Sequence, residues 1–104
     1  MHEATGILEV YGVTAGFVAV DAGCKAADVR VENLDKNKPG DPTGLPVPVI
    51  VVVKFRGSVS AVRSAMEAAA EAARKVSDVI SEHIIPSPTE DTEKMLKISG
   101  FDKT

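Results

Sequence analysis

The chain has 104 residues, a formal net charge of −3 and 44% hydrophobic residues, which favours one folded domain with a single modest core over a disordered chain. The acidic balance and the absence of tryptophan disfavour nucleic-acid binding, because phosphate binding needs a clustered basic surface and single strands need aromatic platforms. We therefore expect no nucleic-acid partner.

Cysteine content and hydropathy indicate the cellular compartment of the protein. The single cysteine excludes an internal disulfide and suits a reducing environment. Residues 1–12 lack the basic start and apolar run of a secretory signal, and no apolar stretch reaches the roughly 18 residues of a membrane span. These features predict a soluble, cytoplasmic protein without a membrane partner.

Two elements are predicted at the start of the chain. Residues 6–13 alternate well enough for a strand, and apolar residues on both faces favour a central position in a sheet. Thr14 can cap a following helix over residues 15–27. Cys24 lies on an apolar face of this helix, so we expect an inert buried thiol. Gly23 inside the helix indicates close packing against a neighbour.

A strand, a proline-rich segment and a second strand follow. Residues 29–34 predict a short strand with one apolar and one polar side. Residues 35–48 contain four of the six prolines and are predicted to form an irregular loop, because proline donates no backbone hydrogen bond. Residues 49–55 form the most β-prone run of the chain and predict a buried strand.

The longest helix is predicted between Ser58 and Ile80, with Ser58 as its N-cap. Apolar residues recur there at gaps of three and four, which keeps them on one face. A row of alanines beside this face would let a neighbouring surface approach closely, although alanine also recurs because it favours helices. The apolar face comprises Val59, Val62, Met66, Ala69, Ala73, Val76 and Ile80, and the alanine row comprises Ala61, Ala65, Ala68 and Ala72.

A strand over residues 79–85 and a short helix over residues 88–98 complete the pattern. Ser87 at the N-cap, Pro88 at the first helical position and Glu90 two residues later would form a capping box. The sequence therefore predicts a distinct third helix near the C-terminus.

The predicted order β-α-β-β-α-β with a short C-terminal helix is that of an α+β, ferredoxin-like domain. In this arrangement one four-stranded antiparallel sheet carries both long helices on one face. We expect a single domain over residues 1–104, with residues 1–5 and 99–104 flexible.

No catalytic or metal-binding constellation stands out. One cysteine cannot form a CxxC metal pair, and His2 and His83 are too isolated for a ligand set. His83, beside Glu82 in a predicted strand, is expected to have a structural or surface role. No Ser/His/Asp or paired-carboxylate arrangement is visible. We therefore predict no catalytic residue, no metal site, no cofactor and no enzymatic activity.

Two long stretches of the chain carry distinctive motifs, GILEVYGVTAGFVAVDAGCKAADV and FRGSVSAVRSAMEAAAEAARKVSDVISEHIIPSP. In the order and spacing of these motifs, the chain resembles the shell-domain family of bacterial microcompartments, the BMC domain. The resemblance implies a structural homohexamer that tiles with other shell-protein paralogues into a bacterial microcompartment shell around encapsulated enzymes. Small metabolites would pass through a pore on the six-fold axis.

The resemblance assigns three residues to the hexamer edge. Lys25 matches the edge lysine, where lysines of adjacent discs lie antiparallel. Asp28 stands where an asparagine is common, and Ser87 stands where many members have an arginine that reaches across the edge. Without that planar, multidentate donor, sheet formation should depend more on other paralogues.

The resemblance also assigns the pore to the loop between the second and third strands. This loop is longer than the usual pore turn by roughly nine residues, and its prolines reduce its backbone freedom. Six copies would gather carboxylates of Asp41 and lysines near one axis, which would set a charge preference. The loop is similar to those of glycyl-radical-enzyme microcompartment shell proteins, but it has no cysteine for an iron–sulfur cluster, and none is expected. The pore-lining residues are Lys36, Asn37, Lys38, Pro39, Gly40, Asp41, Pro42, Thr43 and Gly44.

A second hypothesis comes from the fold class alone. Ferredoxin-like domains also serve as regulatory oligomers that bind a small metabolite between subunits. In that case residues 35–48 would act as a ligand lid rather than a pore lining. Equilibrium binding of metabolites would separate the two hypotheses.

Overall fold

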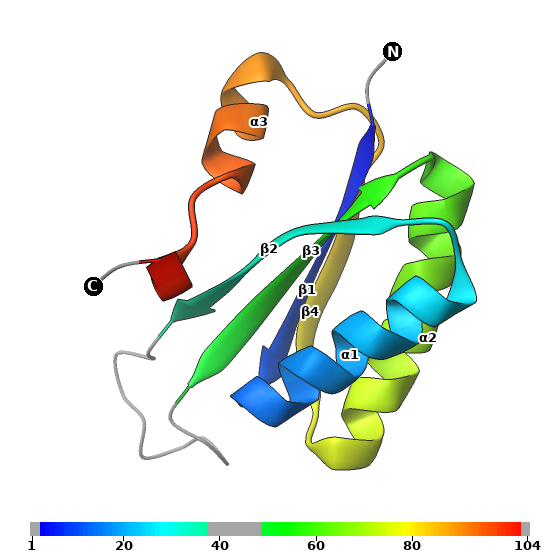
Figure 1. Cartoon of the computed structure of the whole chain (residues 1–104), viewed down its shortest axis with the longest axis vertical. Coiled ribbons are helices and arrows are strands. Elements are labelled where there is room, and N and C mark those ends of the chain that lie inside the picture. The colour runs from blue at the N-terminus through cyan, green and yellow to red at the C-terminus, as the bar shows by residue number, and fades with distance from the viewer. Residues whose placement is uncertain (1–2, 38–48, 103–104) are drawn as a thin grey trace.

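The computed structural model describes residues 3–37 and 49–102 (Figure 1). The elements follow the predicted β-α-β-β-α-β order, and a third helix and a short 3-10 turn, η2, come last. Their bounds are β1 Ala4–Tyr11, α1 Val13–Ala26, β2 Arg30–Asn37, β3 Ile50–Gly57, α2 Val59–Val76, β4 Val79–Ile85, α3 Glu90–Leu96 and η2 Gly100–Asp102.

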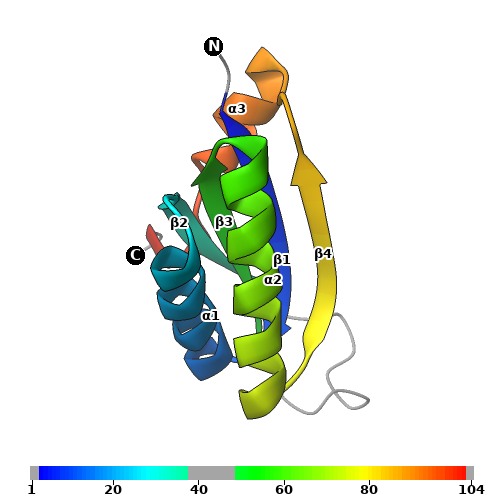
Figure 2. The same cartoon turned by 90° about the vertical axis from the view of Figure 1, so that its right-hand side faces the viewer.

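The four strands form one antiparallel sheet in the order β2-β3-β1-β4. Helices α1 and α2 pack side by side on one face, whereas α3 lies on the other side near the start of β1 (Figures 1 and 2). This arrangement confirms the predicted ferredoxin-like, α+β class with both long helices on one face.

The turn between β1 and α1 differs from the prediction. β1 spans Ala4–Tyr11 rather than 6–13, and α1 begins directly after Gly12. Gly12 has a φ of 90°, a conformation that side-chain-bearing residues rarely adopt. This glycine therefore occupies the N-cap position, and Thr14 lies inside the helix.

The core lies between the sheet and the α1–α2 layer. Alternate residues of β1 and β3 point toward the helices, as the two-residue period of a strand requires. Val62, Met66, Ala69 and Ala73 of the predicted face of α2 supply the other side, whereas Val76 at the end of that face is 48% exposed. The large buried residues are Leu8, Val10, Val51, Val53, Phe55, Val62 and Met66.

Helix α1 buries its smallest residues, and the apolar face that carries Cys24 is only partly buried, through Val20. Cys24 is exposed, and Phe17 is 61% exposed. Small residues face the core instead, because α1 approaches β3 and α2 closely: a Cβ at Gly23 would lie 2.5 Å from Phe55 Cζ. The expected close packing at Gly23 is thus confirmed, and the expected burial of Cys24 is wrong. The buried residues of α1 are Ala15, Gly16, Ala19 and Gly23.

Helix α2 begins as predicted and ends earlier. Ser58 caps it, with the Ala61 N–H donating to Ser58 Oγ at 3.2 Å. The helix ends at Val76 because Ser77 turns away and donates its hydroxyl to the Tyr11 carbonyl at 2.7 Å. The last predicted face residue, Ile80, therefore lies in β4.

Strand β2 extends further than the predicted 29–34. Residues 35–37 continue the antiparallel pairing with residues 50–52 of β3, although the sequence placed them in the loop. The strongly β-prone partner strand overrides their low strand propensity. A register shift between Val31 and Asn33 marks a bulge earlier in the strand. The remainder of the predicted loop, 38–48, lies outside the described residues.

Helix α3 is capped by a different residue than predicted. Thr89 is its N-cap, with the Thr92 N–H donating to Thr89 Oγ1 at 3.2 Å. Ser87 is exposed and precedes the buried Pro88. The Ser87 capping box is therefore wrong by two residues, since Thr89 offers an equivalent hydroxyl closer to the first turn.

A polar layer joins α3 to the sheet. Arg56 and Lys54 point away from the core but are only 2% and 6% exposed. The Arg56 guanidinium donates to both carboxylate oxygens of Glu93, at 2.8 and 2.5 Å. Lys54 Nζ donates to the carbonyls of Leu96 and Ile98, at 3.1 and 2.7 Å. These contacts pair both buried cations with acceptors, as burial of charge requires, although the buried Arg56 Nε has no hydrogen-bond partner among the described residues.

Candidate functional site

The end of the sheet where β1 begins, here called the Arg56 end, carries the residues assigned to the hexamer edge. Asp28 precedes β2 and Ser87 follows β4, so both lie beyond the last row of paired residues. Lys25 occupies the last turn of α1, three residues before Asp28. The row that defines this end is Arg30, Arg56, Thr5 and Ile85.

The opposite end, here called the Asn37 end, is where β2 stops and β3 begins. Asn37 pairs with Ile50, which pairs in turn with Tyr11 of β1. The eight residues of β3 separate the two ends by about 24 Å at 3.4 Å per residue. The residues assigned to the pore and those assigned to the edge therefore lie at opposite ends of one rigid sheet.

Within one protomer the three edge residues do not form a single cluster. Asp28 adjoins β2 and Ser87 adjoins β4, the two edge strands of the sheet. Three strand spacings, about 14 Å, separate these strands. Lys25 Nζ lies 2.8 Å from Asp21 Oδ2 in an exposed ion pair one helical turn apart, which is too exposed to hold the lysine firmly.

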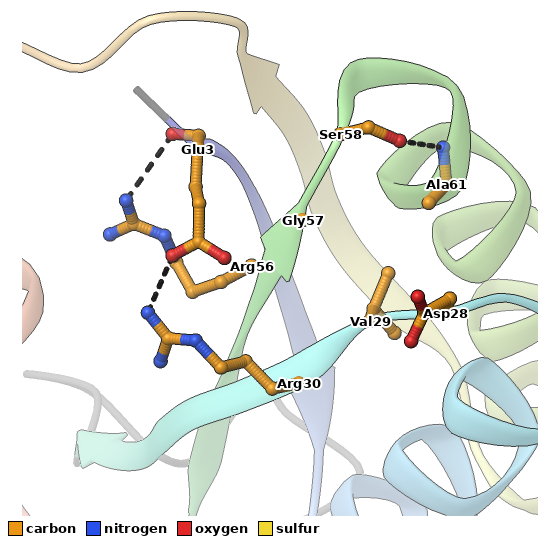
Figure 3. A pocket seen from close by; sticks show the side chains of 8 residues that line it. All are labelled: Glu3, Asp28, Val29, Arg30, Arg56, Gly57, Ser58 and Ala61. Atoms are coloured by element: carbon orange, nitrogen blue, oxygen red, sulfur yellow. Dashed lines mark hydrogen bonds and ion pairs between the residues drawn. The ribbon is translucent and has the colours of Figure 1, made fainter. Parts of the chain in front are cut away.

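A cavity of about 480 Å³ opens at the Arg56 end (Figure 3). Arg30 donates to Glu3 Oε1 at 2.6 Å, and Arg56 donates to the Glu3 carbonyl at 3.2 Å. The Ser58 hydroxyl points to the first turn of α2. Eight residues line the cavity: Glu3, Asp28, Val29, Arg30, Arg56, Gly57, Ser58 and Ala61.

Electrostatics keep the two arginines of this cavity charged. The hydrogen bond to Glu3 raises the pKa of the Arg30 guanidinium. The hydrogen bonds to Glu93 raise the pKa of Arg56. Arg30, whose side chain is 55% exposed, can therefore offer hydrogen bonds to a neighbouring surface, whereas Arg56 is buried and bonded to Glu93 and Glu3.

Sequence analysis missed Glu3, Arg30 and Arg56 as parts of one site. Glu3 belongs to a stretch expected to be flexible, and Arg56 lies one residue beyond the predicted strand over residues 49–55. The structure instead pairs Arg56 with Arg30 across β3 and β2. Two like charges opposite each other need carboxylates nearby, which Glu3, Glu32 and Glu93 supply. The opposition of the two arginines follows from the strand register, which the sequence alone does not give.

At the Asn37 end, Lys36 and Asn37 are the described members of the predicted pore set. Both belong to β2 and are exposed. Lys36 Nζ lies 5.1 Å from the centre of the Phe101 ring. The other predicted pore residues, 38–44, lie outside the described residues. A cavity of about 320 Å³ adjoins this end and is lined by Glu9, Asp35, Lys36, Asn37, Val52, Ile98 and Gly100.

Two further predictions concern ligands and surface residues. His83 is exposed in β4, as expected for a surface histidine. Within residues 3–37 and 49–102, no group of three or more His, Cys, Asp or Glu side chains is placed to hold a metal ion. In the same ranges no helix combines the length and the apolar character that a membrane crossing needs.

Comparisons with known proteins identify the family. The family model of the BMC domain matches residues 4–88. The chain is 40% identical over 95 residues to the bacterial microcompartment shell protein PduA of Salmonella typhimurium, covering 91% of this chain and 92% of that protein. It is 34% identical over 97 residues to the shell protein EutM of the same organism, covering 93% and 92%.

A solved structure agrees with these sequence matches. A microcompartment protein from Desulfitobacterium hafniense aligns with a TM-score of 0.71 and 25% identity, covering 95% of this chain. The present chain spans 49% of that protein's chain. The chain therefore belongs to the BMC domain family of bacterial microcompartment shell proteins.

This membership confirms the resemblance drawn from the two sequence stretches. Its relatives are named as shell proteins, in agreement with the predicted structural, non-catalytic role. The matched region contains every element from β1 to β4 and stops at Pro88. Helix α3 and the 3-10 turn lie beyond it.

Proposed function

We propose that the protein is a homohexameric tile of a bacterial microcompartment shell. Six copies would form a ring with the Asn37 end of each sheet toward the axis and the Arg56 end toward the rim. The tile would join other shell-protein paralogues and enclose enzymes, while small metabolites pass through the central pore. The proposal places the protein in microcompartment shells in the cytoplasm.

The observation that carries this proposal is the separation of the two predicted sets along the sheet. Each protomer of a closed ring that tiles with other rings needs one end facing the symmetry axis and another end that contacts neighbouring rings. Here the pore residues Lys36 and Asn37 lie at one end of the strands, and the edge residues Asp28 and Ser87 lie at the other. The two ends are about 24 Å apart along the strand direction. Such an arrangement supports one pore end and one edge end in every protomer.

The edge chemistry supports a tile that works with paralogues. Lys25 and Asp28 are exposed beside the cavity end of the sheet, where they can meet a neighbouring disc. Ser87 is also exposed but offers one hydroxyl, whereas the arginine of many members offers a planar donor group. We infer that edge contacts between identical discs are weak and that contacts with an arginine-bearing paralogue are stronger.

The pore chemistry centres on residues 36–44. Six copies of Lys36 near one axis would form a ring of ammonium groups and favour anions, because charged rings set the selectivity of pores. The proposed pore set also includes Asp41 and Lys38. Assignment to the glycyl-radical-enzyme type of microcompartment, without an iron–sulfur cluster, stays a prediction because it rests on this segment.

Native mass spectrometry tests the proposal. Six chains of 10.9 kDa should give a closed complex of about 65 kDa. A monomer, dimer or trimer at micromolar concentration and low salt would contradict it. The regulatory-oligomer hypothesis predicts instead tight, saturable binding of a metabolite to the isolated oligomer, which equilibrium dialysis against candidate metabolites would detect.

A further inference from the structure

The segment that follows α3 is fastened to β2 and β3 although it lies beyond the region matched by the BMC family model. Lys54 Nζ holds the carbonyls of Leu96 and Ile98, and Asn33 Nδ2 donates to the same Leu96 carbonyl at 2.9 Å. Lys54 is almost fully buried under this segment. We call residues 96–101 the C-terminal clasp.

The clasp continues along β2 toward the Asn37 end. The hydroxyl of Ser99 donates a short hydrogen bond to the Leu34 carbonyl, and Ser99 is 7% exposed. The Gly100 N–H donates to Asp35 Oδ1 at 2.6 Å. The last three residues of the clasp, Ser99, Gly100 and Phe101, thus contact three successive residues of β2, and the series ends where Lys36 Nζ lies over the Phe101 ring.

The contact between Gly100 and β2 leaves no room for a side chain. A Cβ at Gly100 would lie 2.8 Å from Asp35 Oδ1 and 3.3 Å from the Lys36 carbonyl oxygen. Because that same Asp35 oxygen accepts the Gly100 N–H, it cannot move away without breaking the hydrogen bond. The close approach of the clasp to β2 therefore depends on a glycine here.

The last contact of the clasp is between the Phe101 ring and the ammonium group of Lys36. Lysine carries its ammonium on a flexible four-carbon stem, which leaves an exposed lysine free to sample many positions. An aromatic ring about 5 Å away attracts the ammonium electrostatically and restricts it. Ser99 and Gly100 anchor the backbone that carries Phe101, and its ring, in a residue that is 40% exposed, lies beside Lys36 near the end of β2.

We infer that the C-terminal clasp positions Lys36 and thereby sets the charge selectivity of the pore. This inference rests on the proposed function, because Lys36 must lie near the pore axis. Phe101 is a positioning residue that acts through Lys36 and does not touch the permeating molecule. The clasp would make selectivity a property of this chain's C-terminal segment as well as of its pore loop.

The test compares the flux of an anion with that of a neutral molecule of similar size. Shells assembled with the full-length protein would be exposed to radiolabelled propionate or 1-propanol, and uptake would be measured by rapid filtration. Lys36→Gln should lower the propionate-to-propanol ratio about fivefold, because it removes the charge. Phe101→Leu should lower the ratio about twofold, whereas Phe101→Tyr should preserve it.

A matched control and a second readout separate positioning from damage. Met95→Ala alters a 64% exposed side chain just before the clasp and should leave the flux ratio unchanged. Amide hydrogen exchange of residues 34–37 should accelerate at least tenfold in Gly100→Ala and stay unchanged in Met95→Ala. Equal exchange in Gly100→Ala and the wild type would overturn the clasp as an anchor of β2.

The outcomes distinguish this inference from the proposed function. A ratio that falls in Lys36→Gln but not in Phe101→Leu would leave the pore assignment intact and overturn the role of the clasp. A ratio unchanged in Lys36→Gln would show that Lys36 does not line the pore, so the pore assignment and the inference would both fail.

Discussion

Arg56 of β3 and Glu93 of α3 form a two-point ion pair that fastens the third helix to the sheet. Both guanidinium nitrogens donate to the carboxylate, at 2.8 and 2.5 Å, and the arginine is 2% exposed. This bidentate geometry is the strong form of a charged hydrogen bond. It connects the BMC-matched region to the segment beyond it.

Removing the carboxylate charge should therefore destabilise the fold. We predict that Glu93→Gln lowers the free energy of unfolding by about 2–3 kcal/mol, less than for a fully buried pair because the Glu93 side chain is 28% exposed. Urea denaturation at one fixed protomer concentration measures the change. Glu90→Gln, on the exposed first turn of the same helix, should change stability by about 0.5 kcal/mol or less. Equal effects of the two variants would contradict the prediction.

Because Lys54 is buried, the free energy of unfolding should rise with pH in the alkaline range. Burial lowers the pKa of Lys54 below its usual value, so the folded protein loses this proton at a lower pH than the unfolded chain does. Between those two pKa values the unfolded chain binds more protons, and stability rises with pH. As the pH rises through the alkaline range below 10.5, the usual lysine pKa, the unfolding free energy of the wild type should increase relative to that of Lys54→Met. A difference that is constant or shifts the other way would count against this.

Replacing Gly23 by alanine should disturb the packing between α1 and the sheet. Gly23→Ala would place a methyl group 2.5 Å from Phe55 Cζ and 3.3 Å from the Ala65 carbonyl oxygen. Overpacking of this kind exceeds the gain of about 1 kcal/mol in helix propensity, and we expect a net loss of about 1–2 kcal/mol. Thermal denaturation of Gly23→Ala beside Cys24→Ala measures it, and the exposed neighbour should be nearly neutral. A stabilised Gly23→Ala would show that α1 can move away from the sheet.

The cap of α3 can be tested against the residue that the sequence favoured. Thr89→Ala should lower stability by about 1 kcal/mol, because it removes the acceptor of the Thr92 N–H. Ser87→Ala should change stability little, since Ser87 is exposed and two residues before the cap. Chemical denaturation of both variants decides between them, and a larger loss in Ser87→Ala would reverse the assignment.

Replacing Lys25 by alanine should impair the assembly of discs into sheets without impairing folding. If its side chain joins adjacent discs, Lys25→Ala should abolish the sheets or tubes formed together with an arginine-bearing paralogue in negative-stain electron micrographs, and should leave single hexamers in native mass spectra of the variant alone. Lys75→Ala, another exposed lysine in the last turn of a helix, is the matched control and should retain both. Loss of the hexamer itself in Lys25→Ala would place the residue on a different surface.

The order of elements and the buried face of α2 could be predicted because apolar spacing carries that information directly. Val62, Met66, Ala69 and Ala73 are buried as their periodicity indicated. The same reasoning failed on part of α1, where Phe17 is 61% exposed and Val20 is only half-buried against the core. There the close approach of the helix to Phe55 of β3 selects small residues, and apolar spacing does not report the distance between a helix and a sheet, although Gly23 indicated close packing.

The polar layer was beyond sequence reasoning for a different reason. Charged residues are rarely buried unless paired, so Lys54 and Arg56 indicate solvent exposure when the partner is unknown. Their partners lie about 40 residues away, in α3 and the clasp. The edge and pore assignments came from the family resemblance, whereas the sheet register supplied their placement at opposite ends.

Distances between spin labels on different protomers of the isolated oligomer test most directly which end of the sheet faces the ring axis. Single cysteines would be placed at position 37 or position 87 in a Cys24→Ala background and measured by double electron–electron resonance. Labels at Asn37→Cys should lie closer to one another around the ring than labels at Ser87→Cys. Longer distances at position 37 than at position 87 would place the Asn37 end at the rim and contradict a pore built from β2 and its following segment.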